Sequence, residues 1–180
     1  MSTAQPMNLP LLPPGPDPPH VVYAIIEIPR GGRNKYEYDP QLGLFRLDRV
    51  LYSAVHYPAA YGFIPGTQAG DGDTLDILVT TNEPTFTGCL LEARPVGLLR
   101  MRDEKGEDEK ILAVPTVDPR YDEVQELTHI SASFLREIEH FFTIYKELEG
   151  KRVEMFGWEN RQAAEEVIRA SLIPLPVREA

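Results

Sequence analysis

The chain has 180 residues, of which 42% are hydrophobic and 26% charged, and its formal net charge is −10. This length is enough for one domain with a well-buried core, without disulfides or a structural metal. The acidic balance argues against a nucleic-acid surface, which requires clustered basic residues. The sequence has no stretch of 18 consecutive apolar residues, so we expect no membrane-spanning helix.

The N-terminal residues are rich in proline, and residues 1–19 contain seven of the seventeen prolines. Proline lacks the backbone N–H that helices and sheet ladders need. We therefore predict a proline-rich arm at residues 1–19 and a single domain at residues 20–180.

Two features favour a cytoplasmic protein. The N-terminus has no basic stretch followed by an apolar stretch, so the sequence predicts no signal peptide. Cys89 is the single cysteine and forms no internal disulfide, so nothing indicates an oxidising compartment.

Strand signals dominate the chain between residues 20 and 115. Alternating or β-branched segments bounded by Gly, Pro and Asp indicate strands at residues 21–28, 35–38, 44–50, 75–80, 89–101 and 110–114. Closely spaced strands with few helices favour a small closed or partly open barrel.

The last third of the chain changes to a helical period. Apolar residues recur at helical spacing from Phe134 to Leu148, with Ser131 or Ser133 as the cap and Gly150 as the stop. A final strand is expected at residues 152–158 and a second amphipathic helix at residues 160–172. Strands first and helices after them predict the α+β class.

Three aspartates lie within six residues in the sequence Asp71-Gly72-Asp73-Thr74-Leu75-Asp76, directly before an apolar strand. A carboxylate that enters a strand half buried needs a cation or strong hydrogen bonds. Hard cations such as Mg²⁺ take oxygen ligands and usually keep several waters. The pattern alone leaves two interpretations open, a metal-binding loop and an ordinary polar turn.

A second acidic cluster spans residues 103–110, with the sequence Asp-Glu-Lys-Gly-Glu-Asp-Glu-Lys. Taken alone, it is typical of a solvated hairpin tip. Lys35 and Glu37 likewise fit a same-face ion pair on a strand, which contributes little to stability. The four histidines are scattered and have no metal-ligand spacing.

Ten short motifs follow one another along residues 20–172. They are Ile26-Glu27-Ile28-Pro29, Lys35-Tyr36-Glu37, Asp48-Arg49, Tyr57-Pro58, Tyr61-Gly62-Phe63-Ile64, the three-aspartate motif, Arg94-Pro95-Val96-Gly97, residues 103–110, Tyr145-Lys146 and Gly157-Trp158. In this order they resemble the motifs of the soluble, family I inorganic pyrophosphatases of the bacterial type. Thr74 departs from the proline that is common in the family, but its side chain is no ligand there. The proline-rich arm lies outside the resemblance.

The resemblance implies a five-stranded closed β-barrel, similar to the OB fold and flanked by two main C-terminal helices. It implies Mg²⁺-dependent hydrolysis of pyrophosphate to two orthophosphates by a metal-activated hydroxide, with several Mg²⁺ ions in each active site. It also implies a homohexamer, the common assembly of bacterial members.

The resemblance further implies roles for individual residues. Asp73 resembles the catalytic group that orients and deprotonates the attacking water. The residues that resemble metal ligands are Asp71, Asp76, Asp103, Asp108, Glu27 and Glu37. Those that resemble the substrate-binding set are Lys35, Arg49, Tyr61, Lys110, Tyr145 and Lys146. Tyr57 and Glu104 resemble supporting residues of the site.

A barrel-type oligonucleotide-binding module is the alternative, because small five-stranded barrels often bind nucleic acid. That function requires a basic groove with exposed aromatic residues. The net charge of −10 and the carboxylates beside the strands favour the enzyme.

Overall fold

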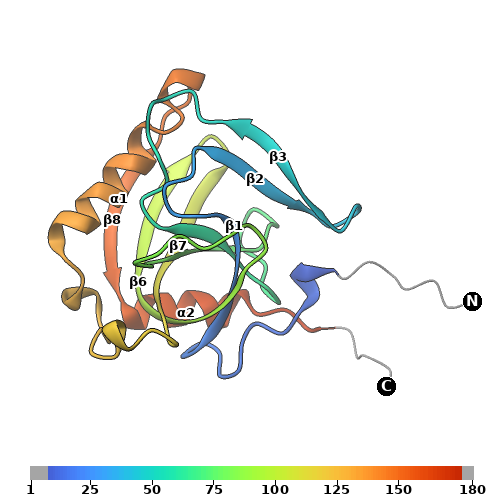
Figure 1. Cartoon of the computed structure of the whole chain (residues 1–180), viewed down its shortest axis with the longest axis vertical. Helices are drawn as coiled ribbons and strands as arrows, with labels where there is room; N and C mark the ends of the chain where they lie inside the picture. The colour runs from blue at the N-terminus through green and yellow to red at the C-terminus, as the bar shows by residue number, and fades with distance from the viewer. Residues whose placement is uncertain (1–7, 176–180) are drawn as a thin grey trace, which may run out of the picture.

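A ring of five strands forms the centre of the molecule, and the computed structural model describes residues 8–175 (Figure 1). The strands of the ring are β1 (Val22–Ile28), β4 (Ala60–Ile64), β5 (Leu75–Val79), β7 (Gly106–Pro115) and β6 (Leu90–Asp103), and β6 closes the ring by pairing with β1. Neighbours in the ring are antiparallel except for β5 and β7, which are parallel. Strand β8 (Glu154–Asn160) adds to the outside of β6. The predicted α+β class and the closed five-stranded barrel are confirmed.

Strands β2 (Asn34–Asp39) and β3 (Leu44–Val50) form a separate hairpin that projects from the barrel (Figure 1). The Asp39 side chain accepts the backbone N–H groups of Gln41 and Leu42 and so fixes the turn. Lys35 and Arg49 are directly opposite one another in the register of the two strands. The hairpin therefore carries two cationic side chains at its end nearest the barrel.

Strand β4 was not among the strands expected from the sequence. It has only five residues, all of them buried, so it shows no alternation of polar and apolar positions. Gly62 lies at its centre, where a Cβ atom would come within 1.9 Å of the Ile25 carbonyl oxygen of β1. Glycine permits this close approach, and it also weakens the strand signal in the sequence.

Helix α1 (Ala132–Ile144) packs beside β8, and helix α2 (Arg161–Ser171) packs on β6 and β8 (Figure 1). The first helix ends earlier than its apolar pattern suggested, and a 3₁₀ turn, η4 (Glu147–Glu149), follows it. Gly150 ends this turn at a φ of 74°, which is a left-handed conformation that favours glycine. Three further 3₁₀ turns are η1 (Leu9–Leu11), η2 (Pro119–Tyr121) and η3 (Leu127–His129). None of the helices in the described part of the chain is long and apolar enough to cross a membrane.

The described part of the proline-rich arm lies against the barrel. The backbone N–H of Gly66 donates to the Pro10 carbonyl, and that of Tyr23 donates to the Pro14 carbonyl, both at 2.8 Å. The single turn at Leu9–Leu11 contains Pro10 near its start. Proline is tolerated there because a backbone N–H at the start of a helical turn has no partner within the turn. Residues 1–7 of the predicted arm lie outside the described residues, and its separation from the domain stays a prediction.

Aromatic side chains from α1 and from the segment around β4 form the floor beneath the polar site. The ring of Tyr57 contacts that of Phe141, and the ring of Tyr61 contacts that of Phe142. Tyr145 contacts both phenylalanines, and the ring centroids in this group are 4.7 to 6.3 Å apart. These rings belong to one of two core clusters, and α2 covers the other through Ala164 and Ile168. Because this floor is close-packed, the polar groups that rest on it are held in fixed positions.

Candidate active site

A polar pocket of about 520 Å³ opens between the β2–β3 hairpin, the loop before β5 and the β6–β7 hairpin. Carboxylates, lysines and tyrosines line it together. The acidic residues are Glu27, Glu37, Asp71, Asp73, Asp76, Asp103, Glu107, Asp108 and Glu109. The lysines and tyrosines are Lys35, Lys105, Lys110, Lys146, Tyr38, Tyr57, Tyr61 and Tyr145.

The three-aspartate motif forms a tight loop that leads into β5. The Asp73 backbone N–H donates to Asp71 Oδ1 at 3.0 Å, and the Asp73 carbonyl accepts from Ala69 at 2.7 Å. Asp71 and Asp73 are exposed, whereas Asp76 is half-buried as the second residue of the strand. The loop therefore presents two exposed carboxylates beside one that is fixed by the sheet.

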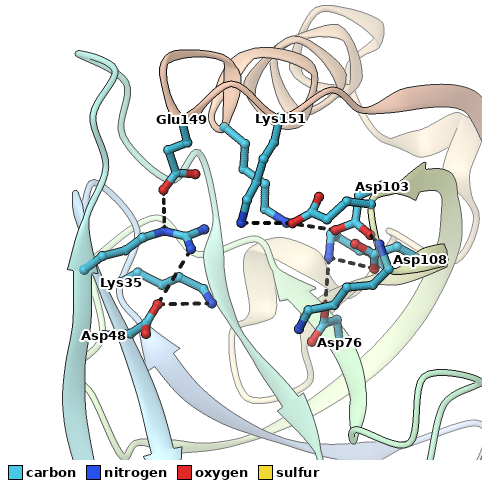
Figure 2. Close-up of polar contacts among 12 residues, drawn as sticks. Lys35, Asp48, Asp76, Asp103, Asp108, Glu149 and Lys151 are labelled. Atoms are coloured by element: carbon cyan, nitrogen blue, oxygen red, sulfur yellow. Dashed lines mark hydrogen bonds and ion pairs between the residues drawn. The ribbon is translucent and has the colours of Figure 1, made fainter.

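Lys110 is the buried cation of the site, with only 2% of its side chain exposed. Its Nζ lies 2.7 Å from Asp76 Oδ2 and 2.9 Å from Asp108 Oδ1 (Figure 2). Burial lowers the pKa of Lys110, but the charges of Asp76 and Asp108 outweigh burial and raise it well above its usual value. Lys110 is therefore fully charged, and it forms ion pairs with two carboxylates at once.

Tyr61 reinforces Asp76 from β4. Its hydroxyl donates to Asp76 Oδ2 at 2.6 Å. Burial, followed by the charge of Asp76, raises the pKa of Tyr61 well above its usual value, so the hydroxyl stays a donor. Asp76 Oδ2 thus accepts from both Tyr61 and Lys110.

Asp103 and Lys146 form a second pair across the site. Lys146 Nζ lies 2.8 Å from Asp103 Oδ2, and the Lys105 backbone N–H donates to Asp103 Oδ1 at 2.8 Å. Burial lowers the pKa of Lys146, but the neighbouring Tyr145 and Asp103 raise it to about 12. Burial raises the pKa of Asp103, but hydrogen bonds from Lys146 and Lys105 lower it below its usual value. Both groups are therefore ionised at neutral pH.

Two glutamates face the same pocket from the barrel and the hairpin. Glu27 of β1 accepts the Tyr38 backbone N–H at 2.9 Å. Burial raises the pKa of Glu27 to about 8, with further contributions from the charges of Asp76 and Glu37. Glu37 pairs with Lys35, whose Nζ also lies 3.7 Å from Asp48. In Figure 2, Lys35 and Asp48 lie across the site from Asp76 and Asp108.

The donor set fits hard divalent cations. The pocket lining contains many carboxylates but no histidine or cysteine, which is the ligand chemistry of Mg²⁺ and similar ions. Within residues 8–175, no three His, Cys, Asp or Glu side chains converge as a ready metal centre. Lys110 lies between Asp76 and Asp108, so these two carboxylates already share a cation.

Comparison with known proteins identifies the family. The family model for inorganic pyrophosphatase matches residues 24–173. The inorganic pyrophosphatase of Haloferax volcanii is 50% identical over 159 residues, which are 88% of this chain and 90% of that protein. The crystal structure of the Thermus thermophilus inorganic pyrophosphatase superposes with a TM-score of 0.90 at 49% identity, covering 92% of this chain and 97% of that one. The structure of an inorganic pyrophosphatase from Coxiella burnetii superposes with a TM-score of 0.86 at 44% identity. The match covers 89% of this chain and 97% of that one.

This chain belongs to the inorganic pyrophosphatase family. The resemblance found in its motifs is confirmed. Membership implies a divalent metal cofactor and pyrophosphate as substrate.

Most of the residues expected from the pyrophosphatase motifs line the pocket. Those that do are Asp71, Asp73, Asp76, Asp103, Asp108, Glu27, Glu37, Lys35, Tyr61, Lys110, Tyr145, Lys146 and Tyr57. Arg49 and Glu104 are not among the lining residues. Arg49 is directly opposite Lys35 in the hairpin register and pairs with Glu149, while Glu104 pairs with Lys151 at 3.0 Å.

Several residues that line the pocket were not singled out in the sequence. Tyr38 follows Glu37 directly, and its aromatic ring contacts Phe45 and Phe63. Lys105, Glu107 and Glu109 share the β6–β7 hairpin with Asp103 and Asp108, and their place in the acidic cluster was the available signal. Pro10 lies in the arm, far from any matching motif, and the sequence offered no signal for it.

Proposed function

We infer that this chain is an inorganic pyrophosphatase that hydrolyses pyrophosphate to two orthophosphates with Mg²⁺ as its cofactor. One observation carries this conclusion: a single pocket brings clustered carboxylates together with lysines and tyrosines. Carboxylates bind hard cations, and lysine and tyrosine donors bind phosphate oxygens. A metal-dependent phosphoryl hydrolase needs both sets in one place.

The metal ligands that we propose are Asp71, Asp76, Asp103 and Asp108, with Glu27 and Glu37 acting mainly through bound water. Bound Mg²⁺ would lower the pKa of water and offset negative charge on the phosphoryl oxygens. Two observations support this assignment: Asp76 is half-buried at the start of β5, and the pKa of Glu27 is raised to about 8 by burial and, to a smaller extent, by the charges of Asp76 and Glu37.

We assign binding of the phosphate groups to Lys35, Arg49, Lys146 and their neighbours. The full set is Lys35, Arg49, Tyr61, Lys110, Tyr145 and Lys146, with Tyr57 and Glu104 in support. Lys35 and Arg49 come from the hairpin, Tyr145 and Lys146 follow α1, and Tyr61 and Lys110 come from β4 and β7. Pyrophosphate bound between them would be held at both phosphoryl groups and oriented for attack.

Asp73 is the residue to which we assign proton transfer. It is exposed in the loop, and its backbone is fixed by the contacts with Asp71 and Ala69. Its carboxylate has no hydrogen-bond partner within residues 8–175, so it is available to accept a proton from the attacking water. Proton transfer to a positioned carboxylate is ordinary general-base catalysis.

We also propose a cytoplasmic homohexamer that binds neither nucleic acid nor membrane, on the family resemblance and the acidic composition. A sedimentation mass near that of the 20.3 kDa monomer at micromolar concentration would overturn the assembly without affecting the catalytic assignment.

Release of orthophosphate from pyrophosphate, measured with and without Mg²⁺, tests the proposed function. Hydrolysis in Mg²⁺ and its loss in excess chelator are expected. Absence of phosphate release from the folded protein in Mg²⁺ would contradict the proposal.

A further inference from the structure

Arg49 forms an ion pair with Glu149, a residue that does not line the pocket. Arg49 Nε of β3 lies 2.9 Å from Glu149 Oε1 of η4, and Figure 2 shows this contact beside Lys35 and Asp48. Only 9% of the Glu149 side chain is exposed. The second acidic neighbour of Arg49 is Asp48, whose Oδ2 lies 3.9 Å from Arg49 Nη1.

Three atoms of this ion pair are buried and lack a hydrogen bond. Within residues 8–175, Arg49 Nε, Arg49 Nη2 and Glu149 Oε2 have no hydrogen-bond partner, so the 2.9 Å contact between Nε and Oε1 is an ion pair without hydrogen-bond geometry. A two-point fork between the guanidinium and the carboxylate would satisfy these atoms. Turning Arg49 away would leave the buried Glu149 carboxylate without its cation, which is costly.

Glu149 is itself fixed relative to Lys146. Its backbone N–H donates to the Lys146 carbonyl at 3.0 Å, and the Lys151 N–H donates to the same carbonyl at 3.2 Å. Gly150 turns the chain in a left-handed conformation directly after Glu149. The turn that carries Glu149 therefore follows directly after Lys146, which belongs to the proposed substrate-binding set.

Within residues 8–175, the hairpin that carries Arg49 makes no strand pairing with the barrel sheet and meets it through contacts such as that of Glu27 with the Tyr38 N–H. Strands β2 and β3 pair only with each other, and Arg49 is directly opposite Lys35 in their register. The Arg49–Glu149 contact thus joins the hairpin half of the phosphate-binding groups to the half at the end of α1. Ser53 reinforces this junction, since its hydroxyl lies 3.4 Å from the Ile144 carbonyl.

We propose that Glu149 is a positioning residue that holds the Arg49 guanidinium and sets the spacing between Arg49 and Lys146 for pyrophosphate. This inference rests on the proposed function, because it concerns the binding of that substrate. Glu149 contacts no substrate itself and acts through Arg49. Its loss should weaken binding of the diphosphate group more than it slows turnover.

The first test compares Glu149→Gln with Glu147→Gln. Both residues lie in the same 3₁₀ turn, but Glu147 is exposed and has no ion pair within residues 8–175. Glu149→Gln should raise KM for pyrophosphate roughly tenfold and change kcat less than about threefold. Calorimetry with imidodiphosphate, a diphosphate that resists hydrolysis, should show a similar loss of affinity. Glu147→Gln should match the wild type in both measurements.

A double-mutant cycle separates positioning from general destabilisation. In an Arg49→Ala background, Glu149→Gln should have no further effect on KM, because the residue through which it acts is gone. Equal effects of Glu149→Gln in both backgrounds would overturn the proposal, as would unchanged imidodiphosphate affinity. Glu149→Asp keeps the charge on a shorter side chain and should bind imidodiphosphate with an affinity between those of the wild type and Glu149→Gln. It replaces Glu149→Gln as the test variant if the latter does not fold.

The outcomes distinguish this inference from the proposed function. A wild-type protein that binds imidodiphosphate but releases no phosphate from pyrophosphate would contradict the catalytic assignment. If the wild type is active and Glu149→Gln binds imidodiphosphate as tightly as the wild type does, the catalytic assignment stands. Glu149 would then have no positioning role.

Discussion

Lys110 and Asp76 are directly opposite one another in the parallel pairing of β5 and β7, and their side chains meet at 2.7 Å. The same ammonium group reaches Asp108 at 2.9 Å. A residue assigned to substrate binding is therefore the counter-ion of two residues assigned to metal binding. Under this assignment, a metal ion would compete with Lys110 for the Asp76 and Asp108 carboxylates.

Replacement of Lys110 tests this competition. Lys110→Met keeps most of the side-chain volume but leaves Asp76 and Asp108 without their shared cation. Affinity for Mg²⁺ without substrate should rise by roughly tenfold, which is about 1.4 kcal/mol, because the variant removes a positive charge that repels the cation and pairs with its proposed ligands. Calorimetric titration with Mg²⁺ measures the effect.

Lys105→Met is the matched control, because it removes the same charge from the pocket lining. The Lys105 side chain has no ion pair within residues 8–175, so its loss should change Mg²⁺ affinity little. If Lys110→Met and Lys105→Met gain Mg²⁺ affinity equally, the effect comes from the overall charge and not from the contacts of Lys110.

The dependence on metal identity follows from the oxygen-only ligand set. Activity should require Mg²⁺, disappear in excess chelator and fall when Ca²⁺ replaces Mg²⁺, because the larger Ca²⁺ ion tolerates looser coordination and lowers the pKa of water less. Phosphate release measured across a series of both ions checks this. Full activity in excess chelator would contradict metal-assisted hydrolysis.

Metal ligands and phosphate-binding residues should respond differently to truncation. Arg49→Ala should weaken pyrophosphate binding or turnover and leave Mg²⁺ affinity without substrate within about threefold of wild type, because its ion-pair partners Glu149 and Asp48 are not proposed metal ligands. Asp71→Ala and Asp76→Ala should weaken Mg²⁺ binding itself by about tenfold or more, because each removes a charged oxygen ligand. Calorimetry with Mg²⁺ alone separates the two groups. Wild-type Mg²⁺ affinity in Asp76→Ala would show that the tight site is placed wrongly.

The fold was largely predictable because most of its elements carry a local pattern. The alternation in the barrel strands and the amphipathic helices is visible in the sequence, whereas the closed ring of five strands was expected from the family resemblance. Strand β4 was missed because all five of its residues are buried. The end of α1 was missed because Tyr145 and Leu148 continue the apolar pattern, although Leu148 is 65% exposed in the 3₁₀ turn.

The site was predictable where its residues are close in sequence and unpredictable where contacts depend on register. Asp71, Asp73 and Asp76 lie within one short loop, so their cluster was evident. The contact of Lys110 with Asp76 depends on a parallel pairing, and that of Arg49 with Glu149 depends on how a hairpin meets a helix end. Neither arrangement leaves a local pattern in the sequence.

Gly62 gives a stability prediction for the strand that was missed. In Gly62→Ala, the new Cβ would overlap the Ile25 carbonyl oxygen, so β1 and β4 must separate. We expect a loss of about 2–3 kcal/mol in the free energy of unfolding, as for other overpacked sites. Chemical denaturation measures it, with Gly70→Ala as the control because a Cβ there has nothing within 4 Å. Equal stability of the two variants would contradict the close approach of β1 and β4.

The final prediction concerns Asp73, to which we assign proton transfer. Asp73→Asn keeps the size of the side chain and its polar character but removes the base and one negative charge. Removal of a general base typically slows a reaction by about 10² to 10⁴-fold, and we expect a loss of turnover in that range. Tight Mg²⁺ binding should be largely retained, because the proposed ligands Asp71 and Asp76 are unchanged.

The turnover–pH profile at saturating Mg²⁺ gives the decisive comparison. Without the aspartate, the attacking hydroxide must form unaided, so the rising limb of the Asp73→Asn profile should move to higher pH. The backbone contacts of residue 73 with Asp71 and Ala69 involve no side-chain atom of Asp73, so the loop and the unfolding midpoint should not change. A variant within about threefold of wild type, with an unshifted profile, would exclude Asp73 as the base. Glu27 and Asp108 would then be the carboxylates to test, since both line the same pocket.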